Sequence, residues 1–93
     1  MSITFHIPAP LRQFTGDAGR VEIKHSAKTL EEALRALADR YPGISHRILN
    51  EQGQIREHIN IFVGEESVRF TGGLAAQVED GCEIFIIPAV SGG

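Results

Sequence analysis

The sequence is poor in several residue types that mark common protein classes. It has no tryptophan, a single cysteine, and twelve acidic against nine basic residues, for a formal net charge of −3. The lone Cys82 excludes a disulfide within the chain and a metal site built from several cysteines. Scattered Lys and Arg argue against nucleic acid, whose phosphates require clustered positive charge. We therefore expect protein partners rather than DNA or RNA.

Long apolar runs are also missing. The most apolar stretch, residues 84–90, is far shorter than the roughly 20 apolar residues that a membrane-spanning helix needs. The N-terminus has no basic stretch followed by an apolar run, so no signal peptide is predicted. A single thiol also fits a reducing compartment. These absences predict a soluble, cytoplasmic protein with no membrane partner.

The residues that are present fit one small folded domain. The chain has 93 residues, 42% of them hydrophobic and 23% charged, which suffices for one core and not for two. It contains no repeats, low-complexity segments or internal linkers. We expect a single domain over residues 1–88, followed by a flexible tail over residues 89–93.

Several short segments carry strand signals. Apolar and polar residues alternate in two N-terminal segments, which we expect to form a hairpin with a long loop. A second hairpin is expected around the turn Gly64-Glu65-Glu66, and Glu79-Asp80-Gly81 marks a turn before a last strand. The predicted strands cover residues 2–7, 20–25, 58–63, 67–70 and 83–88.

One amphipathic helix has the clearest signal. Thr29 is a suitable N-cap, and Glu32 three residues later completes a capping box. Pro42-Gly43 ends the helix, and a second short helical turn is expected at residues 44–49. One apolar stripe runs along the main helix, formed by Leu30, Ala33, Leu34, Leu37, Ala38 and Tyr41.

The order of these elements defines a fold class. Two strands, a helix and three strands predict an α+β protein, in which the helix packs across one face of a mixed four- to five-stranded sheet. A ubiquitin-like β-grasp is the small fold that fits this order best.

The last strand departs from simple alternation. Ile84 and Ile86 lie on one face, but Phe85 and Ile87 make the other face apolar too. Because the chain has one substantial helix, only one face of the sheet can be well covered. We expect Phe85 and Ile87 to be at least partly exposed as a partner site. The alternative is that residues 44–56 form a lid over them.

The side chains at the C-terminus are small. Ala89, Val90, Ser91, Gly92 and Gly93 follow Pro88. Counted from Pro88, six extended residues reach about 20 Å. This length is enough to pass through a narrow channel and place the terminal carboxylate in another protein's active site. Glycine permits this close approach because it lacks a Cβ. A frayed terminus that happens to end in glycines is the plain alternative.

Two segments resemble one family. The terminal segment, Asp80-Gly81 and then Ile87 to Gly93, and the stretch from Asn60 to Leu74 resemble the ThiS/MoaD family of ubiquitin-like sulfur carriers. The similarity is greatest to the CysO type, which serves cysteine biosynthesis. It spans most of the chain and is strongest from about residue 58 onward.

The resemblance implies a carrier rather than an enzyme. An E1-like enzyme would use Mg-ATP to adenylate the Gly93 carboxylate, and a sulfur donor would then convert it to a thiocarboxylate. The chain itself would bind no cofactor. Phe85 and Ile87, together with the tail residues, would contact the activating enzyme and the sulfur acceptor. Those tail residues are Ala89, Val90, Ser91 and Gly92.

The recipient of the sulfur stays open between several pathways. A pyridoxal-phosphate-dependent cysteine synthase is the leading acceptor, and the large subunit of molybdopterin synthase is the main alternative, with this chain as the small subunit. Other sulfur-transfer pathways also remain. A ubiquitin-like modifier, whose Gly93 is joined to lysines of target proteins, would use the same adenylate. A plain interaction module with an irrelevant tail is the third class.

Other chemistry-bearing residues give weaker signals. Cys82 stands where the family commonly has an acidic residue, which raises the question of whether it handles sulfur. Its acidic neighbours Glu79, Asp80 and Glu83 repel a thiolate, so we expect an unreactive side chain. Gly72-Gly73 lacks the spacing of a phosphate loop. The four histidines show no metal-ligand spacing, and are His6, His25, His46 and His58.

Overall fold

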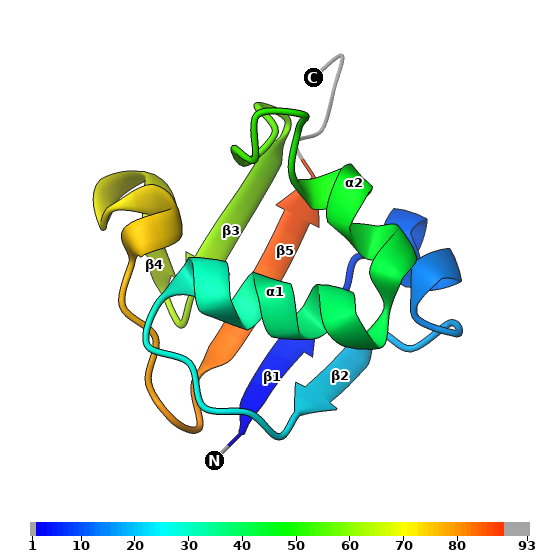
Figure 1. The fold of residues 1–93 in the computed structure, drawn as a ribbon, viewed down its shortest axis with the longest axis horizontal. Coiled ribbons are helices and arrows are strands. Elements are labelled where there is room, and N and C mark those ends of the chain that lie inside the picture. Colours follow the sequence, from blue (N-terminus) through cyan, green and yellow to red (C-terminus); the bar gives the residue numbers. More distant parts are fainter. Residues whose placement is uncertain (1, 89–93) are drawn as a thin grey trace.

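Five strands form one mixed sheet in a computed structural model that describes residues 2–88. Strands β1 (Ile3–His6), β2 (Arg20–Ile23), β3 (Ile59–Val63), β4 (Glu66–Ser67) and β5 (Glu83–Pro88) accompany helices α1 (Leu30–Arg40) and α2 (Ser45–Ile48). The order across the sheet is β2-β1-β5-β3-β4. Strand β5 is central, parallel to β1 and antiparallel to β3, so the mixed sheet and its element order are as predicted (Figure 1).

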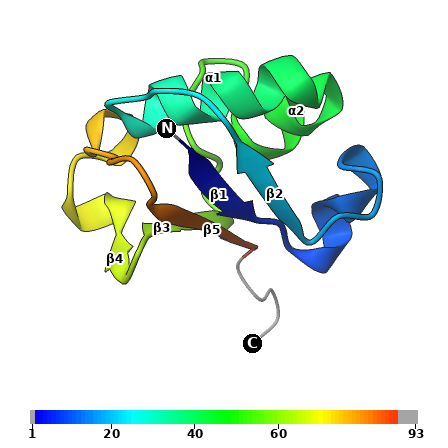
Figure 2. The same cartoon turned by 90° about the horizontal axis from the view of Figure 1, so that it is seen from below.

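The helices lie on one side of this sheet. Figure 2 shows α1 and α2 together above the strands, with no helix across the opposite face. The core between the layers is closed by aliphatic side chains and Phe5, which is fully buried. Strand residues at alternate positions supply the lower half of this core, namely Ile3, Phe5, Val21, Ile23, Ile59, Ile61, Ile84 and Ile86.

The start of α1 follows the predicted capping signal. The Thr29 hydroxyl oxygen accepts a hydrogen bond from the backbone N–H of Glu32 at 3.3 Å. The Glu32 carboxylate turns back to the Thr29 hydroxyl and to the backbone N–H of Lys28, both at 3.4 Å. In this capping box the Glu32 carboxylate therefore accepts from the backbone N–H of Lys28, the residue before the N-cap. Leu30, Ala33, Leu34 and Leu37 are buried as expected, whereas Ala38 and Tyr41 are only partly so.

The second hairpin is shorter than the sequence predicts. We expected a strand over residues 67–70, but β4 ends at Ser67 and η3, a 3-10 helix, covers Val68–Phe70. The Ser67 hydroxyl accepts from the backbone N–H of Arg69 at 3.4 Å and caps this turn. The turn buries Val68 and leaves Phe70 outside.

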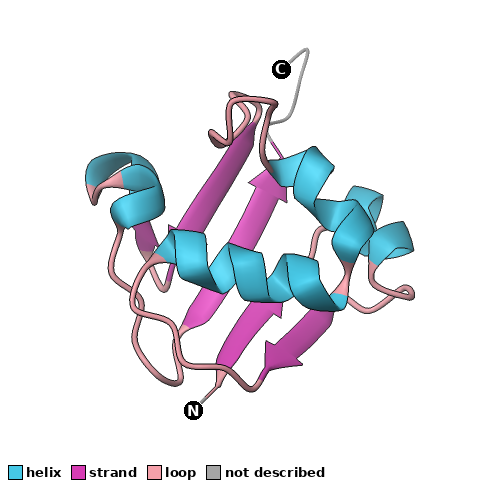
Figure 3. Cartoon of the chain, in the orientation of Figure 1, coloured by secondary structure: helices cyan, strands magenta, loops and turns pink. Residues whose placement is uncertain are grey.

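Three further 3-10 helices lie in the connections, and Figure 3 shows how they interrupt the loops. They are η1 (Ala9–Phe14), η2 (Pro42–Ile44) and η4 (Gly73–Ala75). In η1 the prolines begin a turn between the two strands of the first hairpin, a feature the sequence reading treated as plain loop. Among the described residues no helix is both long enough and apolar enough to cross a membrane.

Candidate functional site

Strand β5 presents different surfaces to the two sides of the sheet. Ile84 and Ile86 are 0% and 2% exposed against the helices. On the other side Phe85 is half-buried and Ile87 is 45% exposed. Residues 44–56 do not cover them, because α2 lies on the same side as α1 (Figure 2). The predicted exposure is confirmed, and the lid alternative is wrong.

An aromatic row crosses the sheet at Phe85. Its neighbour on β3 is Phe62, and its neighbour on β1 is His6. The rings of His6 and Phe85 stack with centroids 4.2 Å apart and planes 7° from parallel. We call the surface formed by His6, Asn60, Phe62, Phe85 and Ile87 the open face. Asn60 belongs to it because it lies opposite Ile87 in the β3–β5 register.

An acidic side chain holds the histidine at the edge of this row. His6 Nε2 lies 2.7 Å from Glu83 Oε1, and the two side chains are 32% and 50% exposed. Glu83 stands two residues before Phe85 on the same strand, so both side chains point to the open face. The sequence predicts His6 only as a surface residue without a metal. Its pairing depends on the β1–β5 register, which spacing in the sequence does not reveal.

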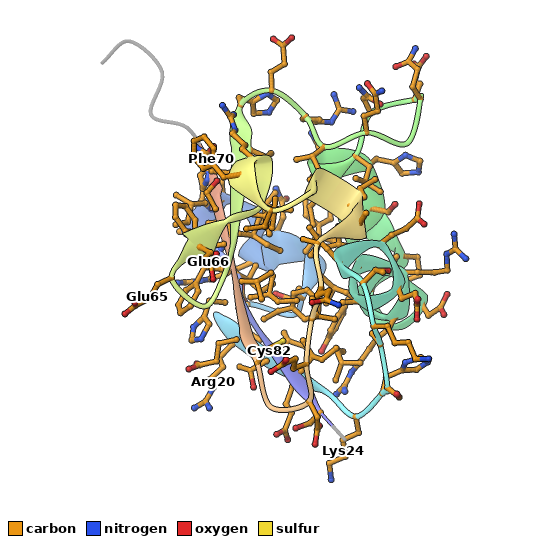
Figure 4. All side chains as sticks on the ribbon, turned by 90° about the vertical axis from the view of Figure 1, so that its left-hand side faces the viewer. Arg20, Lys24, Glu65, Glu66, Phe70 and Cys82 are labelled. Atoms are coloured by element: carbon orange, nitrogen blue, oxygen red, sulfur yellow. The ribbon has the colours of Figure 1, made fainter. Side chains whose placement is uncertain are left out.

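Phe70 adds apolar surface beside the open face. Its side chain is 88% exposed, the most exposed large hydrophobic side chain of the described part of the chain. Figure 4 places it on the side away from α1, as it does Glu65 and Glu66 at the lower end of the β3–β4 hairpin. Phe62 and Phe70 are not among the site residues that the sequence predicts. Phe62 could have been found from its alternation with Ile61, but the η3 turn that exposes Phe70 had no clear signal.

A hollow lies where β5 ends. It has a volume of about 250 Å³ and lies between the end of β5 and the segment that follows β1. Phe85, Ile87 and Pro88 form one wall, while Pro8 and Arg12 contribute to the other. This volume is below the roughly 300–1,000 Å³ of a typical small-molecule pocket, so it suits a side chain rather than a cofactor. The last described residue, Pro88, therefore sits at the rim of an apolar hollow on the open face.

An acidic cleft of about 650 Å³ lies at the other end of β5. Its lining includes Glu66, Glu79, Glu83 and the half-buried Cys82. The cysteine is a free thiol. Five residues of strand lie between it and Pro88, and a strand rises about 3.3 Å per residue. Cys82 and the start of the tail therefore lie at opposite ends of the strand.

Metal ligation has no geometric support within residues 2–88. No group of three or more His, Cys, Asp or Glu side chains is placed to hold an ion there. The site residues Gly93, Ala89, Val90, Ser91 and Gly92, which the sequence predicts, lie outside the described residues. The structure therefore places the predicted residues Phe85 and Ile87 on one exposed surface. His6, Phe62 and Phe70 contribute to this surface although the sequence does not predict it. The described residues end at Pro88, directly before the tail.

Comparison with known proteins agrees with this geometry. The family model described as "ThiS family" matches residues 5–93. The chain is 40% identical over 95 residues to the sulfur carrier protein CysO of Mycobacterium tuberculosis, and the alignment covers 100% of both chains. The similarity thus extends over the whole length, and the match to the family model ends at Gly93.

Solved structures give the same result for the fold. The crystal structure of the Amycolatopsis orientalis BexX/CysO complex contains a chain with a TM-score of 0.88 and 38% identity, covering 98% of this chain and 99% of that one. SAMP1, a small archaeal modifier protein from Haloferax volcanii, matches with a TM-score of 0.82 and 26% identity over 100% of both chains. The fold is the ubiquitin-like β-grasp that the element order predicts.

Proposed function

The chain belongs to the ThiS family and is a sulfur carrier protein of the CysO/ThiS type, and we propose that it carries sulfur as a thiocarboxylate on Gly93 for cysteine biosynthesis. Its relative is named a sulfur carrier protein, and the chain is likewise a carrier rather than an enzyme. The single observation that supports the thiocarboxylate is the full-length match to a sulfur carrier in a chain ending Gly92-Gly93.

The chemistry takes place on the terminal carboxylate in two steps. A carboxylate oxygen of Gly93 attacks the α-phosphorus of Mg-ATP in an E1-like enzyme, which forms the acyl-adenylate and releases pyrophosphate. Sulfide then attacks the acyl carbon, expels AMP and loses its proton, leaving the thiocarboxylate. Adenylation is needed because a carboxylate is a poor electrophile and AMP is a good leaving group. The partner enzyme supplies the catalytic groups, and this chain supplies binding and position.

The open face is the surface that supports docking. Phe85 and Ile87 expose apolar area next to the strand end from which the tail starts, and Phe70 adds exposed apolar area beyond β3. An apolar patch of this kind contributes to association by removing its area from water. Beyond Pro88, residues 89–93 can extend by about 17 Å, at about 3.4 Å per residue. Docking and reaction are thereby separated: the folded domain binds the partner enzyme, and the tail extends to its active site.

The acceptor follows from the CysO similarity. In a pyridoxal-phosphate-dependent cysteine synthase, the thiocarboxylate sulfur of Gly93 would replace the leaving group on the β-carbon of the amino-acid substrate, giving a carrier–cysteine thioester. Hydrolysis of its acyl–sulfur bond by water would then release cysteine and return the carboxylate form of the carrier. Molybdopterin synthase, with its large subunit as the partner, and other sulfur-transfer pathways are the alternatives. A second function, conjugation of Gly93 to lysines of target proteins, is favoured by the similarity to a protein named as an archaeal modifier.

Reconstitution tests this proposal. The full-length chain is incubated with the E1-like enzyme of its own organism, Mg-ATP and sulfide, and its intact mass is measured. We expect ATP-dependent conversion to a species heavier by the difference between sulfur and oxygen. A variant that lacks only Gly93 serves as the matched control, with circular dichroism to verify its fold, and should stay unconverted. Equal conversion of the shortened chain would contradict the assignment to Gly93.

The acceptor is tested with the same material. Purified thiocarboxylate is mixed with the cysteine synthase of the organism and its amino-acid substrate, and cysteine is measured both free and joined to the carrier. Formation of one cysteine for each carrier consumed is expected. Accumulation of carrier–lysine isopeptides in place of cysteine would favour the modifier function instead.

A further inference from the structure

The guanidinium group of Arg12 lies beside the open face in a fixed position. Its Nε donates a hydrogen bond to the carbonyl oxygen of Ile7 at 3.0 Å. A Cβ at Gly19 would lie 3.0 Å from both Cζ and Nε of Arg12 and 3.1 Å from Nη2. The guanidinium thus packs directly on the backbone of Gly19. The backbone of Gly19 has no positive φ that would itself require glycine. Glycine at this position instead leaves the space that the Arg12 guanidinium occupies.

The rest of this guanidinium has unused donors. Within residues 2–88 the single ion pair joins His6 to Glu83, and the terminal nitrogens of Arg12 form no hydrogen bond. Arginine has five N–H donors in a planar fork, of which Nε uses one here. Two parallel N–H groups match the two oxygens of a carboxylate. The remaining donors therefore suit an aspartate or glutamate side chain from another molecule.

The surroundings place these donors in the apolar hollow at the end of β5. Arg12 lines that hollow together with Phe85, Ile87 and Pro88. The acidic cleft lies at the far end of β5. Arg12 therefore places a positive charge where β5 ends, whereas the acidic cleft lies where it begins, and this difference in charge can orient a partner.

We propose that Arg12 binds a carboxylate side chain of the activating enzyme, next to an apolar side chain that enters the hollow. The inference rests on the proposed function, because it names a contact of that docking surface. A protein carboxylate fits better than the phosphates of ATP, since ATP reacts at Gly93, up to about 17 Å of extended chain beyond Pro88. Arg12 is then a determinant of which enzyme the carrier docks on.

The test compares Arg12→Gln with Arg35→Gln in the adenylation reaction of the E1-like enzyme. Both variants lose one positive charge, but Arg35 is exposed on α1, on the opposite side of the sheet. For Arg12→Gln we expect the KM for the carrier to rise about ten- to a hundredfold, the loss of a charged hydrogen bond. The kcat and the KM for ATP should stay as in the wild type. Arg35→Gln should match the wild type throughout.

Salt separates a charge contact from a change of shape. Because ions screen an intermolecular ion pair, the ratio of the KM of Arg12→Gln to that of the wild type should fall towards one between about 0.05 and 1 M salt. Equal KM values for the two variants, a ratio independent of salt, or an increased KM for ATP would each overturn the proposal. Failure of the wild type to be adenylated would instead overturn the proposed function.

A second variant keeps the proposal testable if Arg12→Gln is poorly folded. Gly19→Ala retains the arginine and its charge but pushes the end of a flexible side chain out of place. Thermal unfolding should be close to that of the wild type, while the KM for the carrier rises severalfold. An unchanged KM in folded Gly19→Ala would contradict a role for the fixed guanidinium position.

Discussion

At the scale of single residues, a few polar side chains fix the local geometry on which the site depends. Thr29 caps α1 through its hydroxyl oxygen, and Glu83 holds His6 against Phe85. The contact of Thr29 joins two residues that are close in the sequence, so its spacing could be predicted. The contact between Glu83 and His6 joins two strands that are far apart in the sequence, so it could not be predicted from spacing.

The cap of α1 gives a first prediction. Replacing Thr29 by Ala leaves the N–H of Glu32 without its acceptor, so the free energy of unfolding should fall by about 1 kcal/mol. Chemical denaturation of the full-length chain measures it. Ser26→Ala is the matched control, because the Ser26 hydroxyl forms no hydrogen bond within the described residues and lies in the same connection. Equal stability of the two variants would show that the cap contributes little.

Cys82 gives a second prediction. It lies in the acidic cleft, at the opposite end of β5 from Pro88, and its backbone N–H and carbonyl are bonded to Glu79 and Thr4. Because the thiol is far from the start of the tail, Cys82→Ser should form the thiocarboxylate at the wild-type rate. Mass measurement over time in the reconstituted reaction checks this. A loss of sulfur transfer with intact adenylation would assign Cys82 a role in handling sulfur.

At the scale of elements, β5 connects the core to the docking surface. Alternation along its six residues puts Ile86 in the core and Ile87 on the open face, one residue apart. The strand is central, so it is held on both edges by β1 and β3. The same strand therefore contributes to stability on one side and to recognition on the other.

The two isoleucines test this division. Ile86→Ala should reduce the free energy of unfolding by about 2–5 kcal/mol, because it leaves a cavity in the core. Ile87→Ala, at a position that is 45% exposed, should cost less than about 1 kcal/mol. It should nonetheless weaken binding to the activating enzyme. Urea unfolding and calorimetric titration measure the two effects, and a reversed order of stabilities would contradict the strand's orientation.

Sequence patterns predicted the elements better than their contacts. The bounds of β5 and the start of α1 agree because alternation, helical spacing and capping act over a few residues. The strand expected at residues 67–70 was wrong because Ser67 caps a turn instead. The site was predicted in part: exposure of Phe85 and Ile87 followed from counting helices. Phe62, His6 and Arg12 join it only through strand register and the course of the η1 connection.

At the scale of the whole molecule, one small fold separates binding from chemistry. The helices stabilise one side of the sheet (Figure 1), the other side exposes the aromatic row, and β5 ends at Pro88 beside that surface. The open face and the hollow with Arg12 are both next to this strand end. We infer that a partner is recognised by the fold, while the reactive group is carried on the last residue.

The intact mass of the protein purified from its native organism tests the central claim most directly. Full-length chain is isolated without thiols, and its mass is compared with that of the chain made in a host that lacks the activating enzyme. We predict a population heavier by the difference between sulfur and oxygen, with the added mass on the C-terminal fragment that contains Gly93. Native protein with an unmodified carboxylate throughout, found together with isopeptide links to lysines, would contradict the sulfur-carrier mechanism.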